Sequence, residues 1–202
     1  AALVFRDKKP ARWGLLAACL YVGVAFVQHG RAVGAAGDTA DERNHRIAAQ
    51  VARPTPYNLV LWRSVYRTPD GRIHVDAIHV PLIGRSRVYP GGSVSRFMPA
   101  ARFGYLPEDS RLFRGLERFD GYTRSFAAIL PEQPDRIGDL RTGSLPNRLR
   151  PVVSITPAPR MENPAPTLRP RVLRQTGMDH RERLAFFRMM LGQDLPEPRE
   201  NE

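Results

Sequence analysis

An uncharged run of fifteen residues, Trp13 to Val27, constrains the fold of this chain more than any other feature of its sequence. A helix that crosses the hydrocarbon core of a bilayer needs about 17–25 mainly apolar residues, each rising about 1.5 Å. Ala11 and Gln28 can lengthen the run, and Arg12 and His29 can place their polar ends in the membrane interface. The sequence therefore predicts an N-terminal transmembrane helix.

Two other interpretations of this run stay open. A cleavable signal peptide has a basic flank before an apolar core and small residues after it. Here the small residues are 32–36, and the basic flank consists of Arg6, Lys8, Lys9 and Arg12. A buried helix of a soluble protein is the other alternative. Because the positive charge precedes the run, the positive-inside rule places the N-terminal flank in the cytoplasm. The rest of the chain would then lie outside, in the periplasm of a Gram-negative cell.

Composition excludes several other classes. The chain is 42% hydrophobic and 25% charged, which excludes disorder over its whole length. The single cysteine, Cys19, cannot form an internal disulfide, which excludes a disulfide-rich fold. The net charge is +11, but 29 of the 31 basic residues are arginine and they are spread along the chain. Because no recognition motif accompanies this charge, we do not expect specific nucleic-acid binding.

Residues 54–156 are expected to form a small β-rich soluble domain. Two runs rich in β-branched and aromatic residues, 58–68 and 72–80, flank a Pro-Asp-Gly turn and predict a β-hairpin. Alternation along the second run places His74 and Asp76 on one face and His79 on the other. Further expected elements are a short helix at 108–118, a strand at 122–130 and a strand at 152–156. The predicted fold class is α+β.

The segments around this domain are expected to be helical or extended. Ala-rich residues 30–53 predict a helical connector that breaks at Gly34 or Gly37, restarts after Asp38 or Thr39, and ends at Pro54. Residues 157–177 are proline-rich and predict an extended linker. The chain begins with alanine and in the middle of an element, which suggests a fragment or a processed product.

Residues 178–195 predict an amphipathic helix. Asp179 can cap it, with Glu182 at capping-box spacing. The expected apolar stripe consists of Leu184, Phe187, Met190 and Leu191, Phe186 and Met189 widen it, and Pro196 and Pro198 end the helix. We expect this stripe to dock on the domain core. The alternative is that the helix lies on the membrane surface, helped by its arginines.

Few residues have a pattern that predicts chemistry. His74 and Asp76 could supply two metal ligands, but no third ligand has an informative spacing, and a solvent-facing cross-strand pair is the simpler interpretation. Residues 136–151 form the stretch of sequence that is richest in polar residues. In it Arg136 and Arg141 could bind an anion, and Asp139 could hold an arginine by two hydrogen bonds. The alternative is a loop stabilised by Asp–Arg pairs. The candidate catalytic residues are therefore Asp139, Arg141 and Asp76, and no residue is assigned to a metal or cofactor.

Four stretches in order resemble a known bacterial family. They are NLVLWRSVYRTPDGRIHVDAIHV, RVYPGGSV, LERFDGYTRSF and RIGDLRTGSLPN. Together with the preceding apolar helix, they resemble the C-terminal part of the membrane-bound metal-dependent hydrolases, also described as LexA-binding, inner-membrane-associated hydrolases. The resemblance covers roughly residues 3–156. The resemblance assigns no mechanism to the residues that match the family's pattern. These residues are Tyr66, Asp76, Tyr89, Asp120, Gly138, Asp139, Arg141, Leu145, Pro146 and Asn147. Trp62 and Arg63 also match and could anchor the hairpin by stacking.

The resemblance implies an inner-membrane protein whose catalytic metal motifs lie upstream of this chain, so that a divalent metal would belong to the longer protein. The soluble domain would then cover the active site or select substrate. The alternative is a non-enzymatic, membrane-tethered interaction domain that binds a protein partner or anionic lipid. A third hypothesis is a periplasmic binding module released by cleavage near residues 32–36. The expected partners are membrane lipid and a protein.

Overall fold

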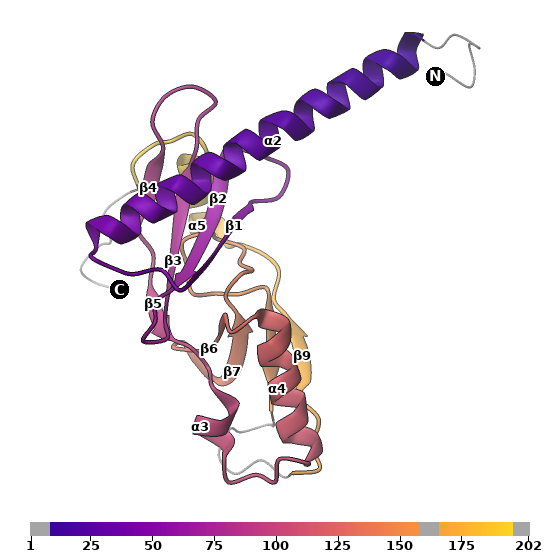
Figure 1. Cartoon of the computed structure of the whole chain (residues 1–202), viewed down its shortest axis with the longest axis vertical. Coiled ribbons are helices and arrows are strands. Elements are labelled where there is room, and N and C mark those ends of the chain that lie inside the picture. Colours follow the sequence, from indigo (N-terminus) through magenta and orange to yellow (C-terminus); the bar gives the residue numbers. More distant parts are fainter. Residues whose placement is uncertain (1–8, 158–165, 196–202) are drawn as a thin grey trace.

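A computed structural model describes residues 9–157 and 166–195 (Figure 1). Its longest element is α2, a single helix over Lys9–Glu42. Residues 10–42 of this helix are long and apolar enough to cross a membrane, and none of the apolar window is buried. This exposure contradicts the alternative of a buried core helix. The basic residues Arg6 and Lys8 lie outside the described residues.

The first sheet is antiparallel and lies beside the C-terminal part of α2 (Figure 1). Its strands pair in the order β1-β2-β3-β4, and β5 also pairs with β3. Gly71 closes the predicted β2–β3 hairpin with a φ of 85°, a conformation that favours glycine. The strands are β1 (Ala49–Pro54), β2 (Leu61–Arg67), β3 (Arg72–His79), β4 (Arg87–Tyr89) and β5 (Ser93–Ser95).

The second sheet is also antiparallel, and its strands pair in the order β6-β7-β8-β9. One helix, α4, packs on it through Leu112, Phe113 and Leu116, as their spacing predicts. Ser110 caps α4 by accepting a hydrogen bond from the Phe113 amide. The strands are β6 (Ala127–Leu130), β7 (Gln133–Asp139), β8 (Val153–Thr156) and β9 (Arg171–Arg174), and the helices are α3 (Pro99–Phe103) and α4 (Arg111–Thr123).

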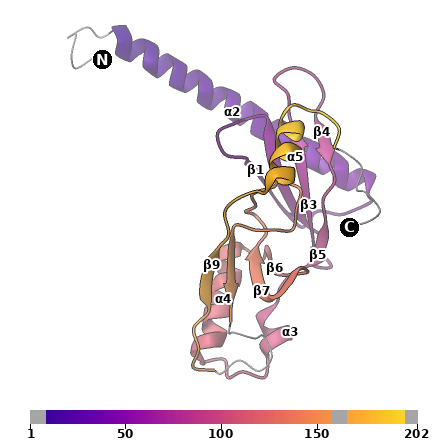
Figure 2. The ribbon, with the colours of Figure 1, turned by 180° about the vertical axis from the view of Figure 1, so that it is seen from behind.

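The two faces of the first sheet are covered by different partners, as Figures 1 and 2 show from opposite sides. On one face, Trp62 and Ile78 pack against Ala32 and Ala36 of α2. The opposite face packs against the second sheet and α5 through clusters that include Val65, Val75, Leu130, Leu140, Ala77 and Met189. Alternation along β2 and β3 therefore assigns their residues to the faces correctly. The result is the predicted α+β fold.

Three expected boundaries are wrong. The helix does not break at Gly34 or Gly37, because α2 is continuous to Glu42. Residues 49–54 form strand β1 rather than the end of a helical connector, since they pair with β2 from Ala49↔Arg67 to Pro54↔Trp62. Residues 122–123 belong to α4, so the expected strand at 122–130 begins only at Ala127.

The C-terminal helix α5 spans His180–Met190 and has the predicted capping box of Asp179 and Glu182. It docks on the domain through part of the expected stripe, namely Phe186, Met189 and Met190. Met189 is fully buried, whereas Leu184 and Phe187 are about half exposed. Residues 171–174, expected in the linker, form β9 and pair with β8. Residues 158–165 of the linker, and Pro196 and Pro198, lie outside the described residues.

Candidate functional site

A group of interacting polar side chains lies where α2 ends and the chain turns into β1. The helix ends at Glu42, and Asn44 reverses the chain with a φ of 56°. This turn places Arg43 and His45 beside Tyr66 and His74, which are cross-strand partners on β2 and β3. Because the pair faces α2, the β2–β3 register decides which side chains the end of the helix can meet.

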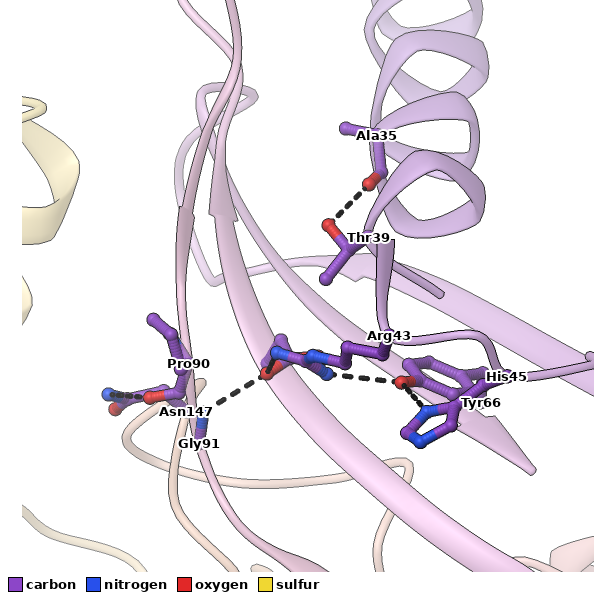
Figure 3. A network of polar contacts seen from close by, with 9 residues as sticks. Ala35, Thr39, Arg43, His45, Tyr66, Pro90, Gly91 and Asn147 are labelled. Carbon is purple, nitrogen blue, oxygen red and sulfur yellow. Dashed lines mark hydrogen bonds and ion pairs between the residues drawn. The ribbon is translucent and has the colours of Figure 1, made fainter. Parts of the chain in front are cut away.

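Arg43 and Asp76 form the central ion pair of this group. The Arg43 Nη1 and Nη2 atoms donate to Oδ2 and Oδ1 of Asp76 at 2.7 and 3.0 Å. Oδ1 also accepts the amide hydrogen of Gly91 at 3.0 Å (Figure 3). These bonds raise the pKa of Arg43 above its ordinary value, chiefly through Asp76. Asp76 is buried, which overturns the expectation that it forms a solvent-facing pair with His74.

Tyr66 links the ion pair to two histidines. Its hydroxyl lies 3.1 Å from Arg43 Nη1 and 2.9 Å from His45 Nδ1 (Figure 3). Because arginine can only donate, the Tyr66 oxygen accepts from Arg43 and its own hydrogen is free to go to His45. The Tyr66 and His74 rings stack at 4.8 Å and 10°, and the His45 and His74 rings lie 4.4 Å apart.

Burial affects the protonation of two members of this cluster, Tyr66 and His74. Burial raises the pKa of Tyr66, so its hydroxyl stays protonated. Burial, followed by the charge of His45, lowers the pKa of His74, so His74 is neutral at pH 7. The arrangement holds a polar network together beneath α2. In residues 9–157 and 166–195, no three His, Cys, Asp or Glu side chains gather as metal ligands.

The other two candidates, Asp139 and Arg141, form a second buried pair at the end of β7. Arg141 Nε and Nη2 donate to Oδ1 and Oδ2 of Asp139 at 2.9 and 2.8 Å. Its guanidinium also lies over the Tyr122 ring, 5.3 Å from the centroid. The predicted two-bond Asp–Arg pair is therefore present, with the arginine of the same loop. Arg141 is only 6% exposed, and its guanidinium is engaged with Asp139 rather than held open to an external anion.

Arg63 is a structural residue whose role the sequence did not reveal. It lies on β2 and is 3% exposed. Its Nε donates to the Leu140 carbonyl at 2.9 Å and its Nη1 donates to the Pro146 carbonyl at 2.9 Å. A Cβ at Gly143 would lie 2.5 Å from Arg63 Nη1, so any other residue there would displace the guanidinium. Arg63 therefore joins the first sheet to the loop between β7 and β8 of the second sheet, and it does so by hydrogen bonds rather than by the expected stacking.

A third polar site surrounds Asp120, one of the residues in the resemblance. Arg96 Nη2 lies 3.5 Å from its Oδ2, and burial raises the pKa of Asp120. Among the described residues, Asp120 Oδ1 and Arg96 Nε are buried without a hydrogen-bond partner. Arg96 also lines an open hollow of about 340 Å³, together with apolar side chains such as Phe97, Met98 and Ile129.

Two residues of α2 fix the helix to the end of the sheet. Gln28 is 2% exposed, and its Nε2 donates to the Val80 carbonyl at 2.7 Å. The guanidinium of Arg31 donates to the carbonyls of Pro81, Leu82 and Gly84. These contacts begin one residue after the uncharged run ends at Val27.

No protein-family model, curated protein or solved structure matches the chain significantly. What the structure defines is a small antiparallel α+β domain that carries an apolar helix of membrane-spanning length.

Proposed function

We propose that this chain is a membrane-anchored domain, held at a fixed position outside the bacterial inner membrane by α2. The observation that carries the proposal is the division of α2 into two parts. Its N-terminal part exposes the apolar run, including Trp13, Leu20 and Phe26, whereas Ala32, Ala36 and Ala40 farther along are buried in the domain. One uninterrupted helix thus belongs to both environments.

The contacts between α2 and the sheet support a permanent attachment. Ala32 and Ala36 let the helix approach Trp62 and Ile78 closely. Gln28 and Arg31 tie one end of this contact to the sheet, and Arg43 ties the other end to Asp76. Cleavage near residues 32–36 would cut through this core, which weighs against release of the domain as a soluble module.

We base the proposed role of this anchored domain on its resemblance to the membrane-bound metal-dependent hydrolases. We propose that it is the accessory domain of such an enzyme, placed over membrane helices that carry the metal and the chemistry. In this proposal Asp76, Asp139 and Arg141 shape the domain, since each is occupied by a partner within the fold. The domain then covers the active site or restricts which substrate reaches it.

A second candidate is a non-enzymatic interaction domain. It is favoured by the outer face of α5, where Leu184, Phe187 and Leu191 are each more than half exposed. Large exposed apolar patches mark protein contacts. A photoreactive amino acid at Phe187 should then crosslink one protein of constant mass in native membranes. The same group at exposed Arg53 on the first sheet should not.

The anchoring proposal is tested with the chain's own two tryptophans. Trp13 lies exposed on the apolar helix, whereas Trp62 is buried in the domain. The full chain is reconstituted in phosphatidylcholine–phosphatidylglycerol vesicles with and without brominated acyl chains. Quenching should be strong in the native chain and should disappear in Trp13→Phe, which retains only Trp62. Equal and weak quenching of both proteins would reject a membrane-spanning α2.

A further inference from the structure

Two loops of the first sheet present apolar side chains to solvent at the same end of the molecule. In the β3–β4 loop, Leu82 is 68% exposed and Ile83 is 93% exposed. In the β1–β2 loop, Tyr57 is fully exposed. Gly84 forms the sharp turn after Ile83 with a φ of 107°. Leu82 and Ile83 thus form the apolar tip of a turn and do not contribute to the core clusters.

Both loops are fixed beside α2 at the level where its exposed apolar run ends. Gln28 donates to the Leu59 carbonyl in one loop and to the Val80 carbonyl at the start of the other. Arg31 donates to three carbonyls of the second loop, including Gly84 at 2.6 Å. Figures 1 and 2 show both loops at the end of the sheet from which the apolar half of α2 projects.

We infer that Tyr57, Leu82 and Ile83 form a second membrane contact, inserted into the headgroup region of the bilayer that α2 crosses. The inference rests on the proposed anchoring by α2. If the apolar run ending at Val27 lies in the hydrocarbon, the hydrogen bonds from Gln28 and Arg31 place the loops at the interface. Tyrosine is enriched at that level of a bilayer, and apolar side chains gain there by leaving water.

The surroundings of the tip fit a lipid surface. Arg85 follows the turn and is exposed, so its guanidinium is available to lipid phosphates. Arg31 donates to the carbonyls of Pro81, Leu82 and Gly84, so these groups keep a hydrogen-bond partner when the loop leaves water. The contact would also fix the rotation and tilt of the domain, which a single helix leaves free.

The experiment places one environment-sensitive fluorophore, NBD, at the tip. Cys19 is the only cysteine, so Cys19→Ala provides a background in which Ile83→Cys can be labelled alone. Val172→Cys is the matched control, because Val172 is 65% exposed and lies on β9 in the second sheet. Both labelled proteins are reconstituted in phosphatidylcholine–phosphatidylglycerol vesicles, with and without brominated chains.

We expect the label at residue 83 to shift to shorter wavelength, to brighten severalfold and to be quenched by brominated lipid. The label at residue 172 should stay in water and be quenched by iodide. If the two labels behave alike while Trp13 is still quenched, the inferred contact of the loops with the bilayer is wrong, but the proposed anchoring by α2 is not. If Trp13 is not quenched, the anchor itself fails. A bright, blue-shifted label at residue 83 that brominated lipid does not quench would indicate burial in the protein and would also overturn the inference.

Discussion

Arg43 holds both carboxylate oxygens of Asp76, a residue 33 positions later in the chain, at 2.7 and 3.0 Å. This pair joins the end of α2 to the middle of β3. It lies under the helix rather than in an open cleft, and it is the contact farthest from the apolar run among those that attach α2 to the sheet.

Asp76→Ala should destabilise the domain by about 1–3 kcal/mol, because a largely covered guanidinium and the Gly91 amide lose their acceptor. The double variant Arg43→Met, Asp76→Leu should recover part of this loss, since replacing both partners leaves no unpaired charge. Urea unfolding of the full chain in detergent measures both. Equal stability of Asp76→Ala and the native chain would show that the pair contributes nothing.

Arg63→Met should be more damaging than any substitution of an exposed arginine. Burial lowers the pKa of Arg63 to about 9, so it is charged at pH 7 and its hydrogen bonds to carbonyls offset the cost of burial. We expect a loss of at least about 2 kcal/mol. Arg63→Lys should not rescue it, because lysine lacks the planar fork. Arg53→Met, at the cross-strand position on β1, is the control and should change little.

Acid should destabilise the chain partly through His74. Its pKa is lowered in the folded state, so the unfolded chain takes up the proton first. The contribution of neutral His74 is therefore complete above about pH 6.5, the ordinary value for histidine, and is lost as the pH falls below it. His45, Arg43, Arg72 and Asp76 surround this ring.

The measurement compares urea midpoints at pH 7.5 and 5.5 for the native chain and for His74→Phe, which keeps an aromatic ring against Tyr66. The native chain should lose more stability than the variant on acidification. Identical losses in the two proteins would remove His74 from the pH dependence.

We expect the small residues on the inner face of α2 to be essential for the stability of the fold, and the glycines of the same segment to be dispensable for it. Ala36→Leu should cost about 1–3 kcal/mol, because Ala36 is buried against the sheet and larger side chains overpack such sites. Gly34→Ala should instead add up to about 1 kcal/mol, since a Cβ there meets nothing within 4 Å. Thermal unfolding of the two variants checks the opposite signs. A stabilising Ala36→Leu would mean that α2 is not docked as the structure places it.

The helix continues through Gly34 and Gly37 because of its tertiary packing, which could not be predicted from the local sequence. Glycine weakens a helix by about 1 kcal/mol, which favours the expected break. The packing of Ala32, Ala36 and Ala40 on the sheet outweighs this local cost. Strand β1 has the same explanation, because its pairing with β2 overrides a local pattern that favours helix.

The apolar helix, the β2–β3 hairpin, the faces of these strands and the capped C-terminal helix could all be predicted from local sequence. Each follows from local rules, namely apolar length, alternation, turn geometry and a capping spacing. What those elements bury depends on tertiary packing. Asp76, Asp139 and Arg141 have the residue types of a catalytic set, but their partners are Arg43 and each other. Partners 33 or more positions apart, such as Arg43 with Asp76 and Arg63 with Pro146, meet only through packing and register.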